Sequence, residues 1–176
     1  MFSFALWNRK LKTLFLARDR FGEKPLFYLH REGSIYFSSE LKAFNEINIF
    51  SKEIDPHSLN LFLALSYVPS PYSIYKGINK LPAGCYLKYG KNIETKPISY
   101  WSVEETFIDA KNNLYDCSED EICNILSNNL EQVLRNQSIA DVPVGAFLSG
   151  GIDSSTIVAI MQSISNKRVK TFTIGS

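Results

Sequence analysis

The first hundred residues alternate short apolar runs with turn-forming residues, the pattern of consecutive β-strands. The runs are separated at 8–10, 22–25 and 32–33, and strands are expected at 2–7, 11–17, 26–29 and 34–37. In the first run both alternating sets of side chains are apolar, so the sheet is expected to be covered on both faces. The pattern therefore predicts a layered structure.

Helical and hairpin signals follow these strands. A short helix is expected at 40–44, and Asp55-Pro56 offers a cap and a first-turn proline for a helix that continues through Leu65. The prolines at 69 and 71 end it. A hairpin is expected between 85–89 and 93–95, turning at 90–92.

The chain changes character between 101 and 118, a polar stretch that we interpret as a linker between two domains, 1–100 and 119–176. Ser118 and Glu121 have the spacing of a capping box, and apolar residues then recur at helical spacing to about 136. An apolar strand at 142–148, a helix at 157–164 and a strand at 169–174 complete the pattern. A strand–helix–strand unit of this length favours a parallel pair with a right-handed crossover.

Composition and charge narrow the range of functions. The chain is 45% hydrophobic and 21% charged, and its 19 basic and 18 acidic residues leave a formal charge of +1. This balance gives no long-range field to attract nucleic acid or anionic lipid, so neither a nucleic acid nor a membrane is expected as a partner. Large apolar residues precede the first basic ones at the N-terminus, the reverse of a secretory signal, and a cytoplasmic location is expected.

Cysteine and histidine give no indication of catalysis. Cys85, Cys117 and Cys123 are odd in number and lack a C-x-x-C spacing, so they are interpreted as reduced thiols. Cys117 and Cys123 have no neighbouring histidine, so they are not expected to be a metal pair or a nucleophile. His30 and His57 are isolated as well.

The most informative residues lie between the strand at 142–148 and the helix after it. Two glycines allow a tight turn close to a ligand, and the serines begin a helix whose free N–H groups face that turn. Such a site attracts phosphate. The predicted loop consists of Ser149, Gly150, Gly151, Ile152, Asp153, Ser154 and Ser155.

The loop differs from the common phosphate-binding motifs. It lacks the lysine of G-x-x-x-x-G-K-[ST], and G-x-S-x-G does not occur around Ser149. Hydroxyl and N–H groups would have to hold the anion, and Asp153 would repel it unless a divalent cation stood between them, so magnesium follows if the ligand is a nucleotide. An ordinary turn followed by a capped helix remains the alternative.

The residues resemble the glutamine-dependent asparagine synthetase family. The loop 149–155, with Val142-Pro143-Val144-Gly145 before it, is similar to that family's pyrophosphate loop. Segments of the first half, 2–7, 17–22, 24–28 and 39–43, resemble the later part of its glutaminase domain. The resemblance implies an α+β half followed by an α/β half: part of an antiparallel-sheet, Ntn-hydrolase-like glutaminase domain, then the beginning of a parallel-sheet, adenine-nucleotide α-hydrolase-like domain.

The resemblance also implies an activity. In that family glutamine supplies ammonia, and ATP activates the aspartate carboxylate as an acyl-adenylate. The loop would hold pyrophosphate, with Asp153 on magnesium, while Phe147 and the segment Ile174-Gly175 match positions that line the AMP pocket. ATP and magnesium are the expected cofactors, ATP, aspartate and glutamine the expected small-molecule partners, and a homodimer is left open for the complete protein. Core packing is the alternative for Phe147 and Ile174.

This chain also lacks features that the family has. Its glutaminase nucleophile is an N-terminal cysteine, which has no counterpart in a chain beginning Met1-Phe2, so we expect no catalytic residue here and an internal fragment that is inactive alone. Two alternatives stay open: a relative that amidates another carboxylate, as in surface-polysaccharide synthesis, and a non-catalytic remnant or interaction module.

Overall fold

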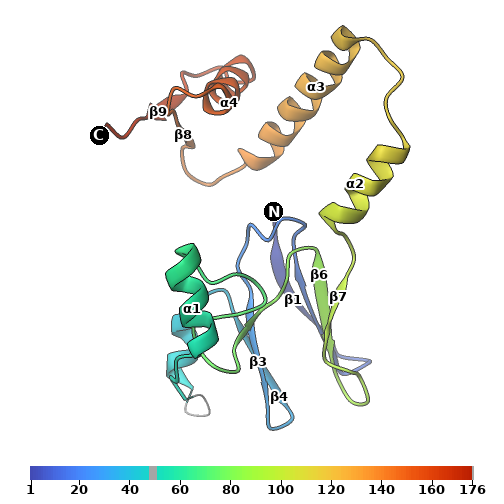
Figure 1. The fold of residues 1–176 in the computed structure, drawn as a ribbon, viewed down its shortest axis with the longest axis vertical. Helices are drawn as coiled ribbons and strands as arrows, with labels where there is room; N and C mark the ends of the chain where they lie inside the picture. Colours follow the sequence, from blue (N-terminus) through green and yellow to red (C-terminus); the bar gives the residue numbers. More distant parts are fainter. Residues whose placement is uncertain (48–50, 176) are drawn as a thin grey trace. The chain divides into compact units, whose positions relative to one another are not determined.

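The computed structural model describes residues 1–47 and 51–175 and divides the chain into two units, Met1–Asn112 and Asn113–Ser176 (Figure 1). The elements of the first unit are β1 (Ser3–Asn8), β2 (Thr13–Arg18), β3 (Phe27–Arg31), β4 (Ser34–Ser38), the 3-10 helix η1 (Leu41–Glu46), α1 (Pro56–Leu65), β5 (Asn79–Lys80), β6 (Cys85–Tyr89), β7 (Pro97–Ser99) and α2 (Val103–Asn112). Those of the second are α3 (Glu119–Gln137), β8 (Gly145–Phe147), α4 (Ile152–Ser163) and β9 (Lys170–Phe172).

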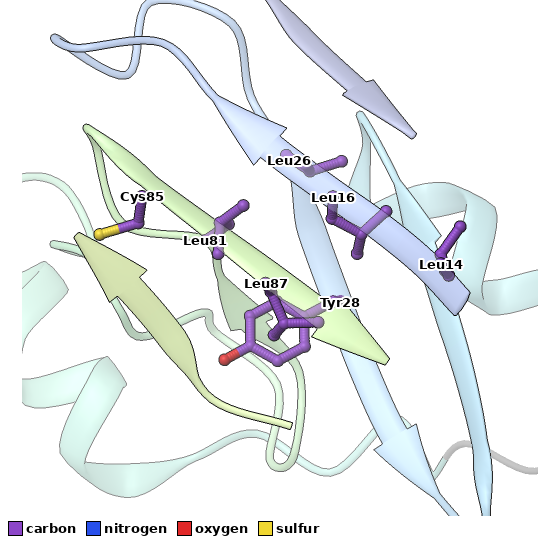
Figure 2. Close-up of a cluster of buried hydrophobic side chains, with 7 residues drawn as sticks. All are labelled: Leu14, Leu16, Leu26, Tyr28, Leu81, Cys85 and Leu87. Carbon is purple, nitrogen blue, oxygen red and sulfur yellow. The ribbon is translucent and has the colours of Figure 1, made fainter. Parts of the chain in front are cut away.

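The first unit contains two antiparallel sheets, in the strand orders β1-β2-β6-β7 and β4-β3-β5. Their main core is a cluster of seven buried side chains from both sheets and the segments beside them (Figure 2): Leu14, Leu16, Leu26, Tyr28, Leu81, Cys85 and Leu87. A second cluster, Leu29, Phe44 and Ile78, includes the residue next to Tyr28 on β3. Because successive strand residues face opposite sides, β3 is buried on both faces at Tyr28 and Leu29.

Strand β1 is less covered than its apolar sequence predicts. Phe4, Leu6 and Trp7 are 44%, 61% and 50% exposed, so the expectation that both faces of this run are covered is wrong within the described residues. β1 is the edge strand of its sheet, with β2 on one side. The amphipathic alternation that would have indicated a half-exposed strand is missing from its sequence.

The hairpin after β6 pairs with a later segment than predicted. β7 lies at 97–99 instead of 93–95, with Leu87 opposite Pro97 and Cys85 opposite Ser99. Within the connection between the strands, Asn92 takes a left-handed φ of 59° and the Ile93 N–H bonds back to the Gly90 carbonyl at 3.3 Å. Proline is tolerated in β7 because this strand is at the sheet edge.

Helix starts follow the predicted caps. The Asp55 carboxylate accepts from the Ser58 N–H at 3.1 Å and from its hydroxyl at 2.6 Å, and Pro56 is the first residue of α1. Ser118 and Glu121 form the predicted capping box of α3. The stretch 101–118 contains α2, which the polar sequence did not indicate. Among the described residues, no helix combines the length and apolarity needed to cross a membrane.

The turn after β2 is held by a buried acid and its neighbouring arginine. Asp19 is 4% exposed, and its carboxylate accepts from the N–H groups of Phe2, Glu23 and Lys24 at 2.9–3.1 Å. Burial alone would raise the pKa of Asp19, but these three N–H groups outweigh it and lower the pKa below its usual value. Arg18 donates to three carbonyl groups at 2.5–2.8 Å, joining this turn to Leu81.

Replacing Asp19 by asparagine is expected to lower the free energy of unfolding by about 2–3 kcal/mol at neutral pH, because an amide NH₂ would face N–H donors that now bond a carboxylate. Since the folded-state pKa lies below the unfolded one, the stabilisation is present above pH about 4 and is lost as pH falls through the folded-state pKa. Urea unfolding at several pH values measures this. Asp116→Asn, an exposed acid, is the control, and equal losses in the two variants would contradict the prediction.

Candidate functional site

The predicted phosphate loop connects β8 to α4 in the second unit. β8 and β9 are parallel, with Gly145 opposite Lys170 and Phe147 opposite Phe172, as the strand–helix–strand pattern predicted. The Leu148 N–H continues the pairing by donating to the Phe172 carbonyl at 2.9 Å. The carboxyl ends of both strands therefore lie at one edge, which is where open α/β sheets bind ligands.

Two glycines shape this strand and loop. A Cβ atom at Gly145 would lie 2.7 Å from the Phe172 ring and 2.9 Å from the Lys170 carbonyl oxygen, so only glycine lets β8 and β9 approach this closely. Gly150 has a left-handed φ of 85° and no atom within 4 Å of the corresponding Cβ position. It therefore provides the turn and leaves open space above the loop.

The serine hydroxyls are partly engaged with one another. The Ser154 hydroxyl donates to the Gly151 carbonyl at 3.2 Å and accepts from the Ser149 N–H at 3.3 Å. It also lies 3.0 Å from the Ser149 hydroxyl, and either of these two hydroxyls can be the donor. Ser154 thus holds both ends of the loop together. Within the described part of the chain, the Ser155 hydroxyl makes no such bond.

Helix α4 begins without a side-chain cap, because its N-cap residue is Gly151. The free N–H groups of its first turn and the helix dipole therefore favour an anion at the loop. Asp153, exposed in that first turn, opposes this.

The donor set fits a magnesium ion shared with phosphate. Mg²⁺ keeps several waters and is usually held by one or two carboxylates together with substrate phosphates. The loop offers one exposed carboxylate, Asp153, beside hydroxyl oxygens. Within the described ranges, no group of three or more metal-ligating side chains gathers at one place. A metal here would therefore depend on the phosphates for its remaining ligands.

The remaining predicted residues lie at the strand ends and are not core residues. Phe147 and Ile174 are 76% and 87% exposed, and Gly175 is exposed as well. Among the described residues, these two side chains therefore offer apolar surface beside the loop, whereas core packing would have buried them. Because they are exposed, these side chains can contact an aromatic or apolar group of a ligand.

Thr173 is a residue of this site that the sequence pattern did not predict. Its hydroxyl donates to the Leu148 carbonyl at 2.7 Å, which joins the start of the loop to the segment after β9. The two residues are 25 positions apart. A hydroxyl next to a predicted strand end was the only signal, and it points to no partner until the strand register is known.

The thiols lie in different environments. Cys85 is buried in the main core of the first unit, and this burial raises the pKa of its thiol. Cys117 and Cys123 are exposed in the second unit, whose sequence contains no histidine. His30 and His57, both in the first unit, pack against the rings of Tyr89 and Tyr72.

Two family models match the chain in succession. A model described as a glutamine amidotransferase domain matches residues 1–101, and a model described as asparagine synthase matches residues 126–176. The second match contains β8, the loop, α4 and β9.

Named relatives agree with both matches. Asparagine synthetase [glutamine-hydrolyzing] 3 of Bacillus subtilis is 38% identical over 164 residues, which are 91% of this chain and 25% of the relative. Asparagine synthetase [glutamine-hydrolyzing] 1 of the same organism is 31% identical, over 99% of this chain and 26% of the relative. A Mycobacterium tuberculosis protein, provisionally named asparagine synthetase [glutamine-hydrolyzing], is 37% identical over 99% of this chain and 27% of its own length. The chain thus spans about a quarter of these relatives.

Proposed function

Because the chain belongs to the asparagine synthetase family, we propose that it is part of a carbon–nitrogen ligase that uses glutamine as its amido donor. In this proposal the first unit belongs to the glutaminase part, and the second unit contributes the ATP site of the synthetase part. The reaction is the amidation of aspartate, with its carboxylate activated by ATP as an acyl-adenylate and attacked by ammonia from glutamine.

One observation carries the nucleotide assignment: a parallel strand ends in a hydroxyl-rich loop at the uncapped N-terminus of α4. The N–H groups of the first helical turn and the Ser155 hydroxyl would hold the pyrophosphate part of ATP. Ser154 would keep the loop in shape through its bonds to Ser149 and Gly151. This arrangement binds phosphate without a lysine.

Asp153 gives the site its metal requirement. Placed alone at the loop, this carboxylate would repel a polyphosphate, and a magnesium ion between the two removes the repulsion. The ion would supply charge neutralisation of the phosphates, held by Asp153 and the serine hydroxyls. Phe147 and the segment Ile174-Gly175, exposed at the adjacent strand ends, would contact the adenosine part.

Replacing Asp153 by asparagine is expected to abolish the magnesium dependence of ATP binding, since the loop contains no other carboxylate. We expect the wild-type chain to bind ATP at least about tenfold more tightly with magnesium than with EDTA, a difference of about 1.4 kcal/mol. Calorimetric titration in the two buffers measures this ratio, which should fall to about one in Asp153→Asn.

Asp141→Asn, an exposed acid of the same unit outside the loop, is the matched control and should keep the wild-type ratio. If wild-type affinity is the same in magnesium and in EDTA, the metal assignment is wrong. If the asparagine variant keeps the full magnesium effect, the ion is held elsewhere.

A further inference from the structure

A cleft of about 700 Å³ lies in the second unit, and its lining shares no residue with the loop 149–155. It is bounded by the end of α3, the segment before β8, the end of α4 and the start of β9. Its lining comprises Arg135, Ser138, Pro143, Val144, Met161, Ile164, Ser165, Lys167, Arg168, Val169 and Lys170. Because Lys170 pairs with Gly145 at the start of the parallel strands, the cleft lies toward the opposite strand ends from the loop.

Charge is distributed unevenly between the cleft and the rest of this unit. Residues 113–176 contain four basic and seven acidic side chains, a formal charge of −3. All four basic residues line the cleft, and none of the seven acidic residues does. Arg135 is paired with Glu131 at 2.7 Å. No ion pair in the described part of the chain involves Lys167, Arg168 or Lys170.

The negative ends of two helix dipoles offset only part of this positive charge. α3 and α4 both end at the cleft, with C-caps at Ser138 and Ile164. Each helix C-terminus carries about half a negative charge, so two ends balance about one cation. Three unpaired cations therefore leave an excess of about two positive charges, which favours an anionic ligand.

The segment that presents two of these cations is ordered by its own hydrogen bonds. The Gln162 side chain donates to the Lys167 carbonyl at 3.3 Å and accepts from the Val169 N–H at 3.0 Å. The Ser165 hydroxyl donates to the same carbonyl at 2.9 Å. These bonds use the backbone of 167–169, so the charged side chains of Lys167 and Arg168 take no part in them.

We propose that this cleft binds a phosphate-bearing organic molecule. The three unpaired cations would contact the phosphates, and the apolar lining from Val144, Met161, Ile164 and Val169 would contact the organic part. The volume lies within the range of small-molecule sites. Because no carboxylate lines the cleft, binding needs no metal, in contrast to the proposed binding at Asp153.

The test uses the whole chain, with ATP and inorganic tripolyphosphate as probes, titrated calorimetrically in EDTA at low ionic strength. The variant K167Q/R168Q is expected to weaken metal-free ATP binding at least about tenfold, because it removes two charged donors. Added salt should weaken wild-type binding as well. ATP should bind more tightly than tripolyphosphate, because only ATP has an organic part.

The control K10Q/K91Q removes the same charge from exposed turns of the first unit and should bind like the wild type. The loop assignment is tested by the magnesium effect in Asp153→Asn and the cleft assignment by metal-free binding in K167Q/R168Q, so that failure of the one and failure of the other give different results. The proposal is overturned if wild-type chain binds no ATP in EDTA, or if K167Q/R168Q binds it unchanged. Equal affinity for ATP and tripolyphosphate would overturn the contact with an organic part.

Discussion

Replacing Gly84 by alanine is expected to lower the free energy of unfolding of the first unit by about 3–5 kcal/mol. Gly84 has a left-handed φ of 63°, and a Cβ atom there would lie 2.2 Å from the Trp101 carbonyl oxygen. The residue cannot easily move away, because its N–H bonds the Asp19 carbonyl at 2.9 Å and its own carbonyl accepts from Tyr100 at 2.9 Å. The strain of the φ angle and the clash with the backbone therefore both destabilise the alanine variant.

Gly33→Ala separates these two causes. Gly33 has a similar φ of 68°, but no atom lies within 4 Å of its Cβ position. We expect this variant to lose only the conformational part, about 1–2 kcal/mol. Urea unfolding followed by tryptophan fluorescence reports on the first unit, because the two tryptophans of the chain, Trp7 and Trp101, both lie in it. Equal losses in both variants would show that the contact with Trp101 relaxes freely.

Local signals predicted elements well where a short-range interaction decides them. The Asp55-Pro56 cap of α1 and the capping box of Ser118 and Glu121 were both confirmed. Each involves atoms three residues apart, so the sequence alone contains the interacting partners. The four strands expected in the first forty residues were also confirmed, within two residues at either end.

Features that depend on distant partners were less predictable. Pairing of β7 at 97–99 and the exposure of β1 depend on which strand occupies the sheet edge, and hydropathy does not encode this order. Helix α2 lies in a stretch interpreted as a linker because its composition is polar. Its first turn holds Glu104 and Glu105 and its last turn Lys111, a helix-compatible charge order.

The same distinction applies to the candidate site. Gly150 and the hydroxyls of 149–155 form one continuous segment, so their approach was predictable from spacing. Thr173 and the close packing of Gly145 on β9 required the parallel register. The basic cleft was not predicted, because Arg135 and the group Lys167, Arg168 and Lys170 are more than thirty residues apart and meet only when α3 and α4 pack together.

Glutamine is expected to remain unhydrolysed by this polypeptide. A thiol nucleophile needs a base that ionises it and a donor site for the developing oxyanion. Cys85 is buried among apolar side chains, and its raised pKa keeps it protonated at neutral pH. Cys117 and Cys123 are exposed, but their unit contains no histidine to serve as the base. Glutamate release, measured with purified chain and glutamine, should therefore equal the uncatalysed background.

Alkylation and substitution of the cysteines test this prediction directly. Iodoacetamide should modify Cys117 and Cys123, which are exposed, more readily than Cys85. Neither this treatment nor the variant C117S/C123S should change the background rate of glutamate release. A rate above background that alkylation abolishes would identify one of these thiols as a nucleophile. In that case the expectation that this chain contains no catalytic residue for glutamine hydrolysis would be wrong.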